Sequence, residues 1–325
     1  MKDLLAPLTF VPPPFDTPWG AGANESRQTE IGRREQTAAL LPSPLFWHSP
    51  RWYEMPLELA DSLATEVSRL GIVVSALRSE LGEADSVPLM HQSSATSKGC
   101  ESGTPLPRMV PYRSERIGLN AVDFDDAAII DVRLALPRDP WGRFSYPPAQ
   151  VQRWERPAAD KPLAGGGWVS AESFPPDVQD QKHLENKVRQ LRILSPGAAI
   201  LLTVSPHRLS DELPSLLSAQ PDGVILQLSE LDLEGLQLAA LVRHARGLLD
   251  KQSPGLALWL VTDEVTADDV AKLVALGADG VAIDCWCEPL WNALLEAHQE
   301  RASQFGYDPH SVDNAFVAQV VAASL

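Results

Sequence analysis

The stretch "TADDVAKLVALGADGVAID" at residues 266–284 decides the fold class, because it reads as one complete helix–turn–strand unit. Thr266 followed by Asp269 is a capping box with Asp in place of the usual Glu, and it predicts a helix that begins directly after Thr266. Residues 267–276 carry apolar side chains at helical spacing. Residues 280–284 form a short apolar run of the kind found in buried strands. Such strands, alternating with amphipathic helices, indicate a parallel sheet covered by helices.

The same alternation extends through most of the chain. The predicted helices cover 57–70, 180–192, 234–249, 267–276 and 288–304, and the predicted strands cover 72–77, 127–136, 198–205, 222–229, 255–261 and 280–284. A further strand is expected near "PLFWHSP" (44–50) or "RMVPYR" (108–113). About 260 residues of this pattern suit a (β/α)8 TIM barrel. The alternative is an open doubly wound sheet, but no glycine-rich turn follows the first strand.

Three segments are expected to flank or interrupt this barrel, which we place at residues 41–305. Residues 1–40 are rich in proline, glycine and polar residues and show no period, so we expect an extended or disordered arm. Residues 137–176 contain eight prolines and three tryptophans, and loops this long in compact domains are usually functional or disordered. Residues 306–325 are expected to be a helical tail.

Composition excludes several classes of function. The 325 residues carry a formal net charge of −16 with a pI of about 4.8, which disfavours nucleic acids and anionic membrane surfaces as partners. No apolar stretch is long enough for a membrane span, and the N-terminus does not resemble a signal peptide. An odd number of cysteines, three, argues against a disulfide framework. We therefore expect a cytoplasmic protein.

Several segments, taken in order, are similar to the FMN-binding barrel domain of glutamate synthases and their stand-alone relatives. Residues 266–284 look like the last helix and strand of that domain, and residues 29–76 resemble its initial segment, first strand and first helix. Residues 111–136 resemble an Arg-Phe-Gly turn followed by a strand carrying Glu-Ile-Lys, and residues 172–205 resemble its Pro-Pro-rich loop, helix and next strand. The resemblance implies a TIM barrel with FMN at the carboxyl ends of the strands. It also implies reductive formation of glutamate from 2-iminoglutarate, often with an iron–sulfur cluster.

The family's phosphate-binding positions are changed in this sequence. Its glycine pair after the seventh strand aligns with Thr262 and Asp263, its glycine after the eighth strand aligns with Asp284, next to Cys285, and a basic residue aligns with Val265. Glycines allow backbone N–H groups to approach a phosphate closely. A carboxylate about 4 Å from a phosphate charge instead repels it by about 4 kcal/mol at an effective dielectric of 20. We therefore expect no bound FMN, unless the family function is retained through altered contacts.

The cluster ligands implied by the resemblance are also missing. The family uses three well-spaced cysteines, whereas this chain has Cys285 and Cys287 together and Cys100 far away. Two thiolates are fewer than the three or four ligands of structural zinc and iron–sulfur sites. We expect no metal site, and interpret the pair as thiols at a strand end.

Three polar residues are candidates for remaining chemistry. Asp131 and Arg133 match the Glu and Lys of the family's strand, and their alternate positions place both on one strand face, towards the barrel interior. They could act in catalysis or anion binding, or form a structural ion pair. His207 follows the strand at 199–204 and is either an acid/base group at the rim or a solvated side chain.

Three hypotheses for function remain. The first is a glutamate-synthase-like barrel that has lost FMN and cluster binding and acts as a non-catalytic subunit or scaffold, with an intact paralogue or another protein as partner. The second is an active FMN-dependent oxidoreductase of glutamate synthase type that uses Arg133 as the anion anchor. The third is a different barrel enzyme in which Asp131, Asp263 and Asp284 gather as acids or cation ligands.

Overall fold

A computed structural model gives the fold. It describes residues 4–10, 29–33, 36–81, 108–114, 118–134, 143, 145–155, 167–171, 178, 181–229, 231, 233, 235–305 and 314–324.

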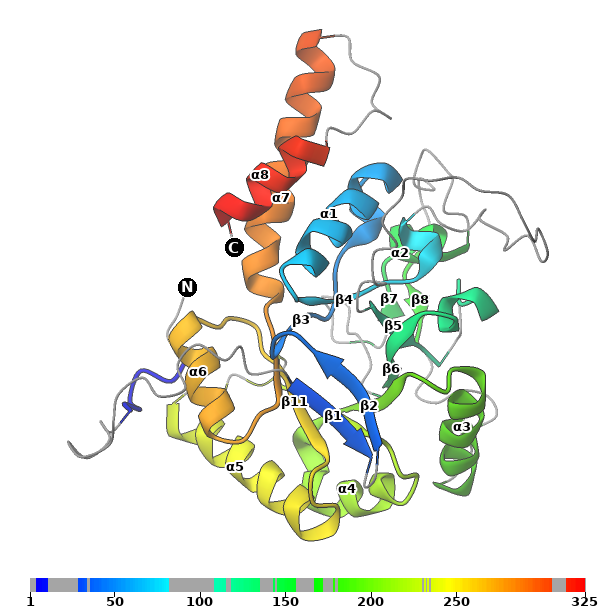
Figure 1. The fold of residues 1–325 in the computed structure, drawn as a ribbon, viewed down its shortest axis with the longest axis vertical. Coiled ribbons are helices and arrows are strands. Elements are labelled where there is room, and N and C mark those ends of the chain that lie inside the picture. Colours follow the sequence, from blue (N-terminus) through cyan, green and yellow to red (C-terminus); the bar gives the residue numbers. More distant parts are fainter. Residues whose placement is uncertain are drawn as a thin grey trace.

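The centre of the molecule is a closed barrel of eight parallel strands, which confirms the predicted TIM barrel (Figure 1). In chain order the strands are β3 (Leu45–Trp47), β4 (Val73–Ser75), β5 (Arg108–Tyr112), β6 (Ala127–Arg133), β9 (Ala199–Val204), β10 (Gly223–Gln227), β11 (Ala257–Val261) and β12 (Gly280–Ala282). Each of these strands pairs with the next one in this order, and β12 pairs with β3 to close the barrel. Both regions offered for a further strand, at 44–50 and 108–113, contain one.

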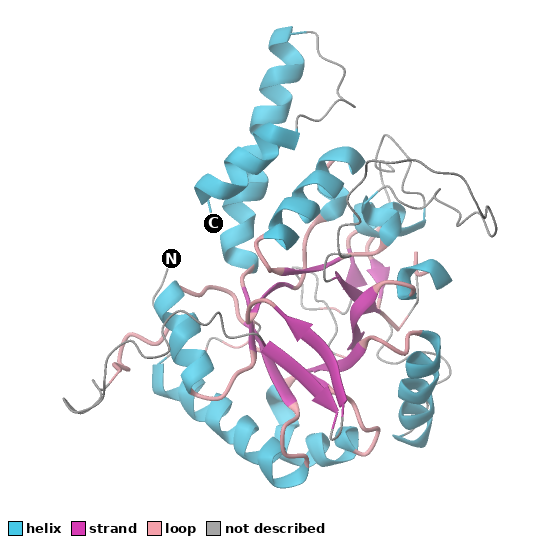
Figure 2. Cartoon of the chain, in the orientation of Figure 1, coloured by secondary structure: helices cyan, strands magenta, loops and turns pink. Residues whose placement is uncertain are grey.

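Helices surround this barrel on the outside (Figure 2). They are α1 (Leu57–Arg69), α2 (Pro148–Glu155), α3 (Gln181–Leu194), α4 (Leu209–Leu217), α5 (Gly235–Gln252), α6 (Ala267–Ala275), α7 (Asp284–Phe305) and α8 (Asn314–Ser324). Short 3-10 turns follow several strands, namely η1 (Trp52–Glu54), η2 (Arg78–Leu81), η4 (Ala121–Phe124) and η5 (Pro206–Arg208). Helix α7 rises away from the barrel, and α8 packs beside it and against α1 (Figure 1). Among the described residues, no helix is long and apolar enough to span a membrane.

The last helix begins earlier than the sequence predicts. A strand over 280–284 and a helix from 288 were expected, but β12 ends at Ala282 and α7 begins at Asp284. The N–H groups of Trp286 and Cys287 already donate to the carbonyl oxygen of Ile283. Helix α7 continues through Pro289, its sixth residue, although proline cannot supply the N–H that would bond to the carbonyl oxygen of Cys285.

Part of the expected N-terminal arm is structured. Strands β1 (Thr29–Arg33) and β2 (Gln36–Leu41) form an antiparallel hairpin where an extended arm was predicted, so that prediction is wrong for these residues. Ile31 and Leu41 are buried in the same apolar cluster as the inward-facing side chains of the barrel strands. Because β2 directly precedes β3, the hairpin closes the end of the barrel at which the strands begin. The two strands are short and show no regular alternation of apolar and polar residues, so their sequence did not predict them.

Residues 4–10 also belong to the folded domain. The backbone N–H groups of Leu4 and Leu5 donate to the Asp269 carboxylate, at 3.1 and 2.8 Å, and the Lys272 ammonium donates to the carbonyl oxygen of Leu5. Asp269 is at the same time part of the predicted capping box of α6, which is confirmed: Thr266 Oγ1 accepts the N–H of Asp269, and Asp269 accepts the N–H of Thr266. One carboxylate therefore holds both the helix start and the N-terminal segment.

The expected irregular segment at 137–176 contains regular structure where it is described. Strands β7 (Ser145–Tyr146) and β8 (Val169–Ser170) pair, and α2 lies between them in the chain. Trp154 of α2 is 2% exposed and packs edge-on against Tyr146, with ring centroids 5.1 Å apart. The indole N–H of Trp154 donates to Glu80 of η2 at 2.6 Å, which attaches the segment to the barrel.

The barrel interior is filled by aromatic side chains opposite a glycine. Trp259 is 1% exposed and lies against Phe46, with ring centroids 4.5 Å apart. A Cβ atom at Gly280, on the neighbouring strand, would approach the Trp259 ring to 2.6 Å. Glycine at this position is therefore required by the close approach of the indole.

We predict that Gly280→Ala lowers the free energy of unfolding by about 1–3 kcal/mol, because the added methyl group overpacks the barrel interior. Urea denaturation measures the change. Gly247→Ala is the matched control, since a Cβ atom there has no neighbour within 4 Å and Gly247 lies inside helix α5. The control should raise stability by about 0.5–1 kcal/mol. Equal stabilities of the two variants would contradict this packing.

Candidate functional site

The carboxyl ends of the barrel strands surround a cavity of about 260 Å3, called here the mouth cavity. In a parallel barrel these ends meet on one face, where side chains from different strands and loops converge. Four barrel strands, the segments that follow β3, β4 and β5, strand β7 and helix α2 supply the lining residues, which are His48, Ser49, Pro50, Arg51, Trp52, Tyr53, Ser75, Glu80, Arg113, Arg133, Tyr146, Gln150, Thr203 and Gln227. Most of them are polar or charged, so the cavity suits a polar ligand.

Asp131 lies at the base of this cavity and is fully buried. Arg133 Nε donates to its carboxylate at 2.7 Å, and His48 Nε2 lies 3.2 Å from the same oxygen. The Thr203 hydroxyl donates to the other carboxylate oxygen. Burial alone would raise the pKa of Asp131, but the Arg133 charge and the His48 and Thr203 hydrogen bonds outweigh it and hold the pKa well below its usual range. The carboxylate is therefore ionised at neutral pH.

His48 is held by this carboxylate and by its neighbour. Ionised Asp131 only accepts hydrogen bonds, so the Nε2 atom of His48 carries the proton. Its Nδ1 atom lies 3.0 Å from the Ser49 hydroxyl. Arg133 completes the network by donating to the carbonyl oxygen of His48 at 2.6 Å and to Ser75 Oγ at 3.1 Å. The predicted pairing of Asp131 and Arg133 on one strand face thus forms a buried ion pair with further partners.

Arg113 stands beside this network, directly after β5. It is 6% exposed, and its guanidinium lies over the Trp154 ring, 3.8 Å from the centroid. Burial lowers the pKa of Arg113 to about 10, against the charge of Glu80, which raises it. The group therefore keeps its positive charge at neutral pH.

A second and smaller cavity, about 150 Å3, lies where the resemblance places the cofactor phosphate. It is called here the acidic cavity and is lined by Trp47, Ser49, Pro50, Arg51, Asp263, Asp284, Cys285, Glu288 and Trp291. The Asp284 carboxylate accepts the backbone N–H groups of His48 and Ser49, at 3.1 and 2.7 Å. These N–H groups at the end of β3 are donors of the kind that bind an oxyanion. Here they already bind a carboxylate of the chain.

The remaining groups of the acidic cavity do not fit a phosphate. Asp263 and Glu288 add two carboxylates to that of Asp284, and Arg51 donates to Glu288 at 2.6 Å and to Glu54 at 3.4 Å. The single cation is therefore paired with acids. A phosphate would meet three carboxylates, each repelling it by several kcal/mol at contact distance.

The loop after β11 has no cation either. Val265, which aligns with the family's basic residue, is fully buried, and its N–H group donates to Cys285 Sγ at 3.4 Å. Trp286 Nε1 donates to the Val265 carbonyl oxygen at 2.6 Å. Thr262, aligned with the first glycine, is 6% exposed, and its hydroxyl has no hydrogen-bond partner among the described residues. Two side chains of α7, Cys285 and Trp286, thus hydrogen-bond to the backbone of Val265 and fix the loop after β11.

The two neighbouring cysteines lie on a helix instead of the expected strand end. Cys285 and Cys287 belong to the first turn of α7, where residues two apart point to different sides. Burial raises the pKa of both thiols, and that of Cys287 well above its usual value. They therefore form no metal-binding pair.

The structure also places His207 and the three aspartates that were proposed to form a cluster. His207 lies in η5 at the rim, as expected, but it is exposed and does not line the mouth cavity. The proposed cluster of Asp131, Asp263 and Asp284 does not form a cation site, because Asp131 lies in the mouth cavity network and the other two line the acidic cavity. Within the described part of the chain, no group of three or more His, Cys, Asp or Glu side chains could hold a metal ion.

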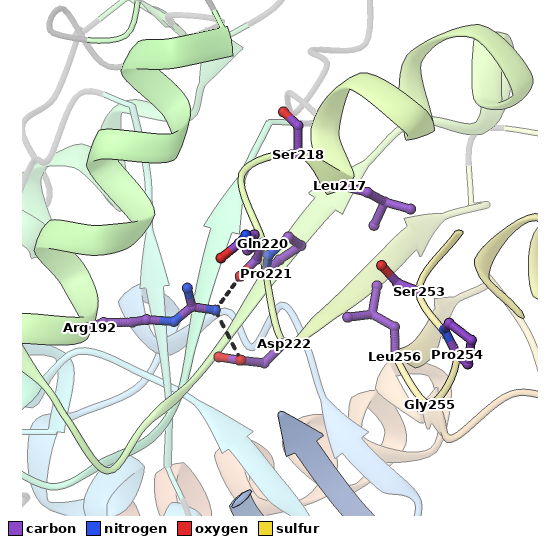
Figure 3. Close-up of a pocket in the computed structure, with 10 residues that line it drawn as sticks. All are labelled: Arg192, Leu217, Ser218, Gln220, Pro221, Asp222, Ser253, Pro254, Gly255 and Leu256. Carbon is purple, nitrogen blue, oxygen red and sulfur yellow. Dashed lines mark hydrogen bonds and ion pairs between the residues drawn. The ribbon is translucent and has the colours of Figure 1, made fainter. Parts of the chain in front are cut away.

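A third cavity, about 730 Å3, lies where strands begin, at the end of the barrel opposite the mouth cavity, and its lining residues are drawn in Figure 3. It is formed by the turns that precede β10 and β11, and Arg192 reaches across it to Asp222 at 3.1 Å and to the carbonyl oxygen of Gln220. Asp222 also accepts the N–H of Ile200 at 2.8 Å. In TIM barrels the face at which the strands begin usually contributes to stability. Here the contacts of Asp222 connect the start of β10 to β9 and to α3.

The sequence reasoning missed His48 and Arg113. Each residue directly follows a barrel strand, His48 after β3 and Arg113 after β5, and residues at that position face the site in this fold. Both strands were recognised as possible, so searching for polar residues at their ends would have found both.

Comparison with known proteins supports the fold. No family model matches the chain, and no curated protein matches it. Among solved structures, mandelate oxidase with 3,3-difluoro-2-hydroxy-3-phenylpropionic acid is 15% identical, with a TM-score of 0.50, over 92% of this chain and 76% of that one. A variant of mandelate oxidase holding an FMN adduct is also 15% identical, with a TM-score of 0.47, over 91% and 77%. The chain therefore shares the barrel fold of mandelate oxidase, while the finer resemblance to glutamate synthases remains a prediction.

Proposed function

We propose that this chain is a flavin-type barrel of glutamate-synthase character that no longer binds FMN and acts as a non-catalytic subunit or scaffold. The observation that carries the proposal is the Asp284 carboxylate, which accepts the backbone N–H groups of His48 and Ser49. A phosphate would need to displace this carboxylate and then tolerate Asp263 and Glu288 in the same small cavity.

The size of the mouth cavity supports the same proposal. Its volume of about 260 Å3 is below the range of roughly 300–1,000 Å3 that is usual for pockets of drug-sized ligands. A flavin with its ribityl phosphate is a large ligand of this kind. The preserved Asp131–Arg133 pair can be explained by structure, because a buried carboxylate requires a partner.

The glutamate-synthase character of the proposal depends on the co-linear sequence resemblance over residues 29–300. The partner expected for such a chain is an intact paralogue of the same type. The N-terminal arm and the segment at 137–176 offer surfaces for it, although much of both lies outside the described residues.

Titration with FMN tests the loss of the cofactor. The purified protein should show no absorbance near 450 nm, and added FMN should keep its full free fluorescence. The variant Asp263→Gly/Asp284→Gly should bind FMN more tightly than the wild type, because two repulsions of several kcal/mol are removed. A yellow wild-type protein with FMN bound one to one would overturn the proposal and favour an active oxidoreductase.

The structural role of Asp284 can be measured separately. We expect Asp284→Ala to lower the free energy of unfolding by about 1–3 kcal/mol, since two backbone N–H groups lose a charged acceptor. Asp250→Ala is the control, because Asp250 is 58% exposed and pairs with Arg246 on the surface of α5. That variant should change stability by less than about 1 kcal/mol. Urea unfolding that gives the same loss for both variants would show that the carboxylate is not a structural ligand.

A further inference from the structure

Arg113 is a buried positive charge without a hydrogen-bonded counter-ion. Its side chain is 7% exposed, and the nearest carboxylate oxygen, Oε1 of Glu80, is 4.0 Å from its Nη2 atom. Within the described part of the chain, its guanidinium makes no hydrogen bond. Buried ionised groups are normally both paired and hydrogen-bonded, so this one differs from the usual case.

Glu80 is engaged elsewhere and does not fill this role. Its Oε2 atom accepts the N–H of Leu77 at 2.8 Å, and its Oε1 atom accepts the indole N–H of Trp154 at 2.6 Å. These two bonds fix the carboxylate in the wall of the cavity, at a distance from Arg113 that is beyond hydrogen bonding.

The other two arginines of the mouth cavity are already satisfied. Arg133 donates to Asp131, to a backbone carbonyl and to Ser75, and Arg51 pairs with Glu54 and Glu288. Arg113 is therefore the one arginine of the mouth cavity whose guanidinium has no hydrogen-bond acceptor among the described residues, although Glu80 is its ion-pair partner at 4.0 Å. The charge of Arg133 lies close enough to lower the pKa of Arg113, so an anion beside Arg113 would reduce the repulsion between the two guanidinium groups.

We propose that the mouth cavity binds a small organic monocarboxylate, with its carboxylate group on the guanidinium of Arg113. The planar guanidinium offers two parallel N–H donors to a carboxylate. A single carboxylate would satisfy these donors, whereas the charges of Glu80 and of the buried Asp131 oppose a second negative charge. The site is separate from the acidic cavity and goes beyond the proposed function, which requires no ligand.

The size and lining of the cavity define the ligand further. A volume of about 260 Å3 corresponds to eight or nine water molecules at roughly 30 Å3 each, so we expect an acid with about five to nine non-hydrogen atoms. Burial raises the pKa of Tyr53 to about 12, so its phenol stays neutral and can donate to the ligand. Gln227 and Thr203 add further polar groups, which favours an acid with a polar substituent.

Calorimetric titration of the full chain tests the proposal, with propionate and 3-hydroxypropionate as monocarboxylate probes and glutarate and inorganic phosphate as comparators. We expect at least one monocarboxylate to bind, and to bind more tightly than either dianion. Arg113→Gln should weaken that binding about tenfold or more, because it removes the charge and keeps a hydrogen-bonding side chain. Arg113→Lys should restore part of it.

Arg189→Gln is the matched control, since the Arg189 side chain is 62% exposed on helix α3 and does not line the mouth cavity. It should bind the probe as the wild type does, and circular dichroism should show that all variants are folded. Failure of both monocarboxylates to bind would overturn the proposal, as would tighter binding of phosphate or unchanged binding by Arg113→Gln. A wild-type protein that binds both FMN and a monocarboxylate would overturn the proposed function alone.

Discussion

The buried carboxylate of Asp131 is the constraint on which the mouth of the barrel depends. It lies on β6 and is reached by His48 after β3, by Thr203 of β9 and by Arg133, which also bonds Ser75 of β4. A buried ionised group is tolerated only when its neighbours pair with it, so four strands must keep their relative positions. The positions of His48, Thr203 and Arg133 at the cavity follow from this requirement.

Charge is divided between two sides of the mouth. The ends of β11 and β12 carry acids, with Asp263, Asp284 and Glu288 around a small cavity, whereas the ends of β5 and β6 carry Arg113 and Arg133. In a flavin-binding barrel the phosphate side is the one that needs donors and cations. This chain has the opposite arrangement, so an anion is favoured on the side of β5 and disfavoured on the side of β11. The division explains how one barrel face can reject a phosphate and still accept a small acid.

Much of the fold could be predicted from the sequence, because the pattern of apolar runs and amphipathic helices is local. The helix cap at Thr266 and the buried strands are examples of features set by neighbouring residues. The bonds from the N–H groups of His48 and Ser49 to the Asp284 carboxylate could not be predicted in this way, since these residues are far apart in the chain. The hairpin of β1 and β2 is stabilised by the barrel interior, and its own sequence carries little signal.

The candidate site was predictable in part for the same reason. Asp131 and Arg133 are two residues apart on β6 and so lie on the same face of the strand, which makes their pairing predictable. Arg113 became notable only through its distance from Glu80, which depends on the packing of α2 and Trp154. The alignment drew attention to Asp263 and Asp284, but it could not show that the Asp284 carboxylate accepts the N–H groups of His48 and Ser49.

Asp284 can be regarded as a ligand that is covalently attached to its own binding site. A tethered group has an effective concentration set by the geometry of the chain, and it cannot be diluted or removed by dialysis. Any soluble anion must compete with it at all times, whatever the concentration of the protein. A cofactor-binding ancestor that acquired this residue would have lost affinity in a single step, and reversal would require both removing the tethered acid and supplying a cation. The carboxylate thus makes the change in the barrel difficult to reverse.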